Sequence, residues 1–235
     1  MYLTTSQTKE FGALLKAFFT LPYSTDLDGK DAETLLRIVK NARGRRSKRK
    51  ELFDIIDGNI GYSVKTLFKS PTALRVDLQE QRFCDVDTMR KMLSKGPATD
   101  AEQGEILLGY MHRRITDQMT LCGINDAKSL ILLKHWDAEK SHFSFRYWEE
   151  DFLGYIDDLR KRNEAGEIEW LLLPAGIHAR DRIRADESGK NVRLLRMHQK
   201  HNQIFTDHDI PSDAIRIEFT TTRVTWERLA TLLGT

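Results

Sequence analysis

The stretch LFDIIDGNIGYSVKT, residues 52–66, decides the fold that the sequence predicts. It contains two short β-rich runs, 52–56 and 60–66, which are joined by DGN at 57–59. An Asp-Gly pair between two such runs is typical of a tight hairpin turn. The sequence therefore predicts an antiparallel hairpin near the first quarter of the chain.

The hairpin brings together side chains that suit phosphate chemistry. Alternation places Asp54 and Ile56 on one face of the first strand, and Ser63 and Lys65 on one face of the second. A carboxylate and an ammonium can then meet across the pair. Phosphodiester hydrolysis needs a metal ion held by carboxylates and a cation near the attacking water. An ordinary surface salt bridge between Asp54 and Lys65 is the alternative interpretation.

Helical and strand patterns alternate around the hairpin without the regular period of a barrel or a doubly wound sheet. The predicted fold class is α/β, with a mixed central β-sheet flanked by helices. The predicted helices cover residues 6–20, 28–41, 87–94, 100–121, 150–163 and 226–233, and the further strands cover 74–78, 130–136, 143–148, 168–173, 192–197 and 215–221.

Length and composition exclude several classes of protein. At 235 residues the chain suits a single domain, and 40% hydrophobic with 31% charged residues is ordinary for a globular protein. No run approaches the roughly 20 apolar residues of a membrane span, and no signal peptide precedes the first helix. Two cysteines, Cys84 and Cys122, are too few for a disulfide framework, which predicts a reducing cytoplasm.

Positive charge is concentrated locally although the formal net charge is only +2. KNARGRRSKRK at 40–50, between the second helix and the hairpin, contains seven Lys and Arg residues in eleven positions. Clustered cations on a loop suit phosphate groups, because each neutralised phosphate releases counterions. A solvated loop is the alternative. The candidate DNA contacts in this run are Arg43, Arg45, Arg46, Lys48 and Arg49.

Asp54, the turn and the SVK triplet at 63–65 resemble the core hairpin of the PD-(D/E)XK nuclease superfamily, which includes many type II restriction endonucleases. Phe53 replaces the usual proline, and Ser63 replaces the usual second acid. One subgroup of restriction enzymes has SxK on this strand and takes the missing carboxylate from farther along the chain. The resemblance covers roughly residues 28–82.

The same resemblance implies where the other acids of the site lie. Glu80, with fourteen residues between it and Lys65, is the first choice for the relocated carboxylate, and Asp77 is the second. Glu33, in the helix before the hairpin, is placed like a glutamate that the superfamily often uses as a metal or water-positioning ligand. The implied catalytic set is Asp54, Lys65, Glu80, Glu33 and Ser63, and the implied metal ligands are Asp54, Glu80 and Asp77.

Two segments contain side chains able to contact DNA. RVDLQEQRF at 75–83 follows the hairpin, and a segment rich in Arg, His and Gln at 180–203 forms a predicted hairpin. Arg and Gln can bond guanine and adenine edges in bidentate fashion, although both segments can equally be polar surface. The candidates are Arg75, Gln79, Gln81, Arg82, Arg193, Arg196, His198 and Gln203.

The resemblance implies a magnesium-dependent, sequence-specific endonuclease that acts on double-stranded DNA as a homodimer. A single domain is expected over 1–235, with a catalytic core at about 28–150 and a recognition and sheet-completing region at 165–235. Two alternatives remain open: a non-catalytic DNA-binding module, and another nuclease of the superfamily acting in repair or on RNA.

Overall fold

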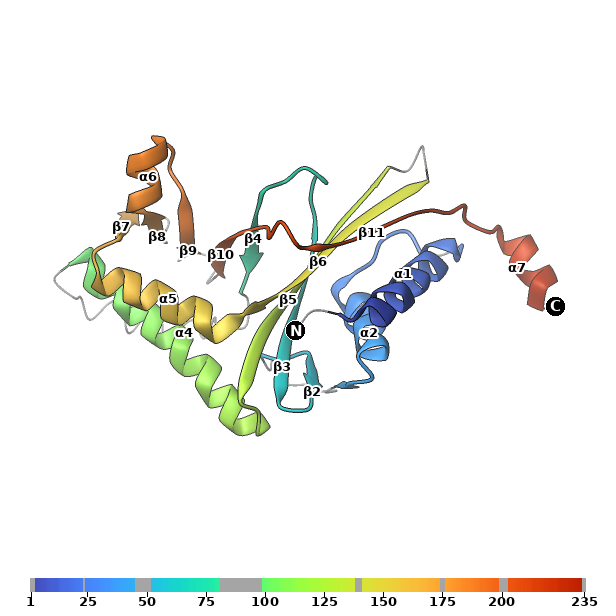
Figure 1. Cartoon of the computed structure of the whole chain (residues 1–235), viewed down its shortest axis with the longest axis horizontal. Helices are drawn as coiled ribbons and strands as arrows, with labels where there is room; N and C mark the ends of the chain where they lie inside the picture. Colours follow the sequence, from blue (N-terminus) through green and yellow to red (C-terminus); the bar gives the residue numbers. More distant parts are fainter. Residues whose placement is uncertain are drawn as a thin grey trace.

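The computed structural model describes residues 3–22, 24–44, 52–80, 99–137, 141–173, 176–198 and 203–233. The side chains of residues 43, 44 and 233 are outside this description. Helices and strands form a mixed α/β structure with two sheets (Figure 1). The expected α/β class is confirmed, whereas the expectation of one central sheet is wrong, because strands from the later part of the chain form a sheet of their own.

The first sheet contains the predicted hairpin. Its strand order is β1-β2-β3-β5-β6-β11. Strands β3 and β5 pair in parallel, and all other neighbouring strands of this sheet pair antiparallel. Gly58 has a φ of 56° in the two-residue turn between β2 and β3, a conformation that glycine adopts at no steric cost. The strands are β1 (Arg43–Gly44), β2 (Ile55–Asp57), β3 (Ile60–Phe68), β5 (Asp126–Asp137), β6 (His142–Asp151) and β11 (Ile215–Thr220).

The second sheet is antiparallel and has the order β4-β10-β9-β8-β7. The predicted strand at 74–78 is its β4, so this strand leaves the sheet of the hairpin that it follows. The prediction of a hairpin within 180–203 is wrong in its first half: β9 lies in this segment, but residues 182–188 form helix α6 (Arg182–Ser188), and the strand that pairs with β9 before it, β8, ends at Asp181. The strands are β4 (Arg75–Gln79), β7 (Ile168–Leu173), β8 (Gly176–Asp181), β9 (Arg193–His198) and β10 (Gln203–Asp209).

Helices cover the two sheets on separate sides (Figure 1). Side chains of α1 (Thr5–Thr20) and α2 (Gly29–Val39) share a buried cluster with β3, β5 and β6. The long helix α4 (Asp100–Cys122) starts with a capping box between Thr99 and Glu102 and ends at Gly123, which has a φ of 66°. It packs against α5 (Phe152–Glu164). The last helix, α7 (Trp226–Leu233), lies beyond α1 at the end of the segment after β11.

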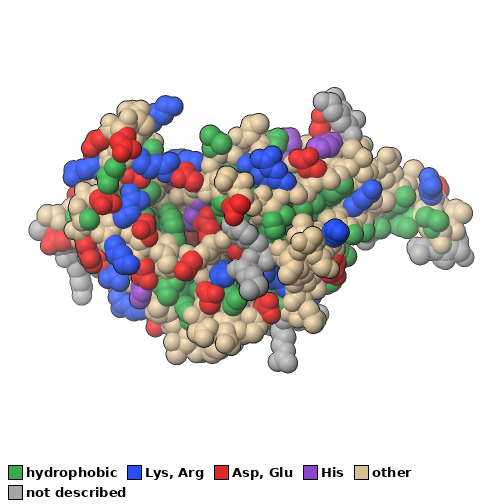
Figure 2. Space-filling view, in the orientation of Figure 1, with side chains coloured by type: hydrophobic (Ala, Val, Ile, Leu, Met, Phe, Trp, Pro, Cys, Tyr) green, Lys and Arg blue, Asp and Glu red, His purple; other side chains and the backbone are tan. Residues whose placement is uncertain are grey.

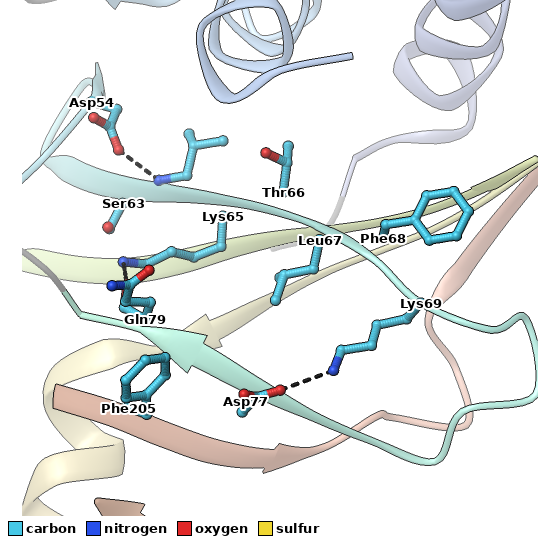
Figure 3. Close-up of a pocket in the computed structure, with 11 residues that line it drawn as sticks. Asp54, Ser63, Lys65, Thr66, Leu67, Phe68, Lys69, Asp77, Gln79 and Phe205 are labelled. Carbon is cyan, nitrogen blue, oxygen red and sulfur yellow. Dashed lines mark hydrogen bonds and ion pairs between the residues drawn. The ribbon is translucent and has the colours of Figure 1, made fainter. Parts of the chain in front are cut away.

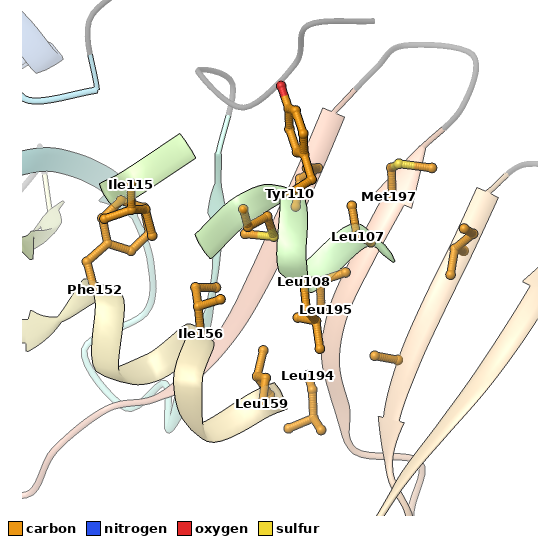
Figure 4. Packing of buried hydrophobic residues seen from close by; sticks show 14 of the residues in the cluster. Leu107, Leu108, Tyr110, Ile115, Phe152, Ile156, Leu159, Leu194, Leu195 and Met197 are labelled. Carbon is orange, nitrogen blue, oxygen red and sulfur yellow. The ribbon is translucent and has the colours of Figure 1, made fainter. Parts of the chain in front are cut away.

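Two clusters of buried side chains join the sheets. The larger cluster places α4 and α5 against the second sheet, with Leu108, Ile156 and Leu195 inaccessible to solvent (Figure 4). The smaller cluster packs Val76 and Leu78 of β4 against strands of the first sheet. Removal of this apolar surface from water stabilises the contact between the sheets. The two sheets therefore form one packed body around the segment from β3 to β4.

Most predicted elements are present with ends shifted by a few residues, while β1, β8, α6 and β10 were not predicted as separate elements. The predicted helix at 87–94 lies outside the described residues. None of the described helices is long and apolar enough to cross a membrane.

Candidate active site

A cavity of about 500 Å³ lies where β3 of the first sheet meets β4 and β10 of the second (Figure 3). Its walls are polar on the side of the hairpin and include apolar side chains farther along β3. The lining residues are Asp54, Ser63, Val64, Lys65, Thr66, Leu67, Phe68, Lys69, Asp77, Gln79 and Phe205. Three predicted site residues of the hairpin, Asp54, Ser63 and Lys65, thus share one cavity.

Asp54 is fixed by the backbone of the hairpin. It immediately precedes β2, so the prediction that it lies within a strand covering 52–56 is wrong. Its carboxylate Oδ2 accepts a hydrogen bond from the Val64 N–H at 2.8 Å, and its own N–H donates to the Tyr62 carbonyl at 2.8 Å. The hairpin therefore places the half-buried Asp54 carboxylate beside the strand that holds Lys65.

Lys65 reaches from the first sheet to the end of β4. Its ammonium Nζ lies 2.7 Å from Glu80 Oε2 and donates to the Gln79 carbonyl at 3.0 Å. The Glu80 side chain is 1% exposed and the Lys65 side chain 13% exposed, so the pair is largely removed from solvent. The Glu80 N–H in turn donates to the Ile204 carbonyl at 2.7 Å. The structure thus brings together Lys65 and the first choice for the relocated carboxylate.

Asp77, the second choice, interacts with two other cations. Its two carboxylate oxygens lie 2.9 Å from Lys69 Nζ and 2.9 Å from an Arg196 terminal nitrogen. Burial acts to raise the pKa of Asp77, but the hydrogen bond and charge of Lys69 outweigh it, and the pKa lies below its ordinary value. Asp77 lines the cavity as a partner of Lys69 and Arg196.

Ser63 and Glu33 occupy different places. Ser63 is 1% exposed and lines the cavity beside Lys65. Glu33 is half-buried on α2, and α2 covers the face of the first sheet that includes Tyr62. Lys65 projects from the opposite face because side chains alternate along β3. Glu33 is not among the cavity's lining residues, so the structure does not place it with the hairpin residues in this cavity.

Lys40, the first cation of the basic run, points into the protein. Its ammonium lies 2.8 Å from Glu149 Oε1 and 3.3 Å from the Tyr62 hydroxyl, and Tyr147 also hydrogen-bonds Glu149. Burial raises the pKa of Tyr62, so its hydroxyl stays protonated at neutral pH. With 9% of its surface exposed, Lys40 is held inside the protein by these contacts and is not part of an exposed cluster of cations.

The described candidates for DNA contact lie on the second sheet, where the arginines pair with carboxylates. Arg75 lies 2.9 Å from Asp209, and Arg193 lies 3.8 Å from Asp207. His198 and Gln203 are half-buried at facing ends of β9 and β10. Of Arg43 only the backbone is described, and Arg45, Arg46, Lys48, Arg49, Gln81 and Arg82 lie outside the described residues.

Comparisons with known proteins add no relative. No protein-family model, curated protein or solved structure matches this chain. The chemistry of the site therefore rests on its own residues.

The donor atoms at the cavity suit a hard cation. Within the described segments, no group of three or more His, Cys, Asp and Glu side chains could hold a metal ion. The Asp54 carboxylate nevertheless lines the cavity, and Glu80, which is not a lining residue, contacts the lining residue Lys65. Magnesium is commonly held by one or two carboxylates together with water and substrate phosphates. Asp54 and Glu80 are therefore of the ligand type that Mg²⁺ takes in proteins, with water and phosphate oxygens as the remaining ligands.

Several lining residues were not assigned to the site from the sequence, among them Lys69 and Phe205. Lys69 follows the end of β3, and Phe205 lies on β10, which was not predicted as a strand. The alternation of Ile204, Phe205 and Thr206 was a signal for that strand, with Phe205 on the face opposite to its buried neighbours.

Proposed function

We propose that this protein is a magnesium-dependent endonuclease of the type II restriction class, which hydrolyses phosphodiester bonds in double-stranded DNA. The observation that supports it is the contact between Lys65 and Glu80 at the cavity that Asp54 lines. The resemblance to PD-(D/E)XK nucleases implied a lysine close to carboxylates, and here Lys65 pairs with Glu80 while Asp54 lines the same cavity as Lys65. A restriction-endonuclease-like core at about 28–150 is part of the proposal.

Each residue has a distinct part in the proposed reaction. Asp54 and Glu80 would hold Mg²⁺, which when bound polarises a phosphate oxygen and lowers the pKa of a bound water. Lys65 would donate hydrogen bonds to the attacking water and stabilise the negative charge that develops on the phosphate. Ser63 keeps the position next to Lys65 small and polar. One ammonium and two carboxylates leave a net negative charge, which attracts the divalent cation.

A double-stranded substrate requires two active sites, and this determines the number of protein copies in the proposed complex. One such cavity cuts one strand, so two copies of the chain, one on each strand, would cut a duplex. A symmetric homodimer reads a palindromic sequence, since a two-fold protein axis matches a two-fold axis in the site. The exposed residues of the second sheet and the basic run after Lys40 would contact the DNA, in a cytoplasmic restriction system.

Cleavage in the presence of Mg²⁺ tests the proposal. Purified protein incubated with plasmid and phage DNA should yield discrete fragments that vanish with EDTA. Lys65→Ala should lower the single-turnover rate by about 100-fold or more, as removal of one transition-state donor does in other enzymes. Lys128→Ala is a matched control, because Lys128 pairs with Asp126 outside the cavity.

The result can also overturn the proposal. Wild-type protein that cuts neither methylated nor unmethylated DNA would contradict it. Salt-sensitive binding of DNA that Asp54→Asn leaves unchanged, without cleavage, would assign the non-catalytic binding module instead.

A further inference from the structure

Phe205 gives the cavity an aromatic surface. It is half-buried on β10 and lines the same cavity as Asp54 and Lys65 (Figure 3). Gln79 lies directly opposite Phe205 in the β4–β10 register. Leu67 of β3 adds a second apolar side chain to the lining. Binding of a phosphodiester backbone alone needs cations and hydrogen-bond donors, so these apolar side chains indicate that another part of the substrate enters the cavity.

The ring of Phe205 is held in place from one side. The Arg196 guanidinium carbon lies 4.3 Å from the ring centroid, over one face of the ring. Arg196 is itself tied to Asp77, and Asp77 to Lys69. His198 contacts the ring edge-on, with centroids 5.6 Å apart. A ring backed by a guanidinium and fixed by an ion-pair chain is pre-organised to stack with a flat partner.

Gln79 adds a group that can bond the edge of such a partner. Its backbone carbonyl accepts from Lys65, whereas its side-chain amide makes no hydrogen bond with the described part of the chain. An amide offers one acceptor and two donors, which matches the edge of a nucleobase. The cavity of about 500 Å³ falls within the size range of small-molecule sites and so has room for one nucleotide.

We propose that the nucleotide next to the cleaved phosphate leaves the base stack and that its base lies on Phe205, with Gln79 at its edge. This inference rests on the proposed nuclease function and specifies the state of its substrate. Enzymes that draw a base out of a duplex must supply its unstacking energy, which is least for unpaired or mismatched bases. The site therefore prefers a phosphate flanked by an unpaired base, and stacking on Phe205 offsets the unstacking in a paired duplex.

Binding measured without divalent metal distinguishes the contribution of the base to affinity from the contribution of the phosphates. The probe is a fluorescein-labelled oligothymidylate, compared by anisotropy with an abasic deoxyribose phosphate strand of equal length. Wild-type protein should bind the thymidylate about 5- to 150-fold more tightly, the range for stacking of one base on an aromatic side chain. Phe205→Leu should abolish most of this preference, and Phe205→Tyr, which keeps the ring, should retain it.

Phe219→Leu is the matched control, because Phe219 is also a half-buried strand phenylalanine but stacks on Phe143 outside the cavity. It should keep the preference. Equal binding of both strands by wild type, no binding of either, or an unchanged preference in Phe205→Leu would overturn the inference.

Two further readouts complete the test. An oligouridylate arm identifies the source of the base: tighter binding of thymidylate assigns DNA, and tighter binding of uridylate assigns RNA. Cleavage of DNA without any base preference would refute stacking on Phe205 but keep the nuclease, whereas a base preference without cleavage by any metal would refute the nuclease.

Discussion

Lys65 Nζ lies 2.7 Å from Glu80 Oε2, and the two residues reach this contact from different sheets. Lys65 belongs to β3, which the hairpin positions, and Glu80 directly follows β4 at the edge of the second sheet. The cavity therefore lies between the two sheets, and the positions of the candidate site residues depend on how the sheets pack against each other.

Removal of one partner of the Lys65–Glu80 pair should destabilise the protein, because the other charge is then buried without a counter-charge. Lys65→Met leaves the Glu80 carboxylate without its ammonium and should lower the free energy of unfolding by about 3 kcal/mol. The double variant Lys65→Met/Glu80→Met should lose less free energy of unfolding than the sum of the losses in Lys65→Met and Glu80→Met alone. Urea denaturation measures the free energy of unfolding of the wild type, the two single variants and the double variant. Lys69→Met, from a more exposed pair, is the control and should cost about 1 kcal/mol or less. Additive losses in the double variant would show that the pair is not coupled.

Glu80 and Asp77 should differ in their effect on cleavage. Glu80→Gln should abolish Mg²⁺-dependent cleavage by removing a proposed ligand charge, with a loss of about 100-fold or more. Asp77→Asn should keep metal-dependent cleavage, because Asp77 pairs with Lys69 and Arg196. Rates measured across a range of Mg²⁺ concentrations distinguish them. A large increase in the required Mg²⁺ for Asp77→Asn alone would assign the relocated carboxylate to Asp77.

Asp207 should make stability depend on pH in a defined direction. Burial raises the pKa of Asp207 above its ordinary value, and Arg193 only partly opposes this. A carboxyl with a raised folded-state pKa favours folding while it is protonated, and this contribution is lost as the pH rises through that pKa. Asp207→Asn should therefore raise the free energy of unfolding near pH 7, and the gain should shrink as the pH falls toward about 4, the pKa of an unfolded aspartate.

Urea denaturation across this pH range checks the Asp207 prediction. Asp209→Asn is the control, because the exposed Asp209 pairs with Arg75 and Arg184 and its neutralisation should give no gain. A gain in Asp207→Asn that does not change with pH would contradict the proposed cause.

Two glycines of α4 should respond in opposite directions to the same substitution. A Cβ at Gly104 would lie 2.0 Å from Trp170 Cε2, so Gly104→Ala should push α4 from the second sheet and cost about 2 kcal/mol. A Cβ at Gly109 meets no atom closer than 3.9 Å, so Gly109→Ala should add about 1 kcal/mol through helix propensity. Thermal unfolding compares the two variants. Equal midpoints would mean that Trp170 moves aside without cost.

Elements with strong local signals could be predicted from the sequence. Residues 168–173 form β7 and residues 226–233 form α7, as their patterns indicate. The hairpin could also be predicted, because its turn and its alternation are local. The hairpin also predicted that Asp54, Ser63 and Lys65 lie close together. Asp54, however, is held by a hydrogen bond from the Val64 N–H and is not positioned by strand alternation.

The remaining features depend on contacts between distant parts of the chain. In β10, Thr206 and His208 are buried polar residues. They hydrogen-bond each other, and His208 also pairs with Glu150 of β6. Polar residues of this kind suggest a loop when their partners are unknown. Lys40 likewise appeared as part of a solvated basic run, because Glu149, which holds it, lies far along the chain.

The pairing of β4 with β10 sets an order of events during synthesis of the protein. The hairpin that holds Asp54 and Lys65 closes over a short loop, which is fast, whereas Glu80 is positioned by Ile204 of a strand that emerges from the ribosome far later. Until residues 203–209 have emerged, β4 has no described neighbour in its sheet. A growing chain on the ribosome therefore holds an incomplete site, and the proposed nuclease gains its cutting activity only after residues 203–209 have emerged.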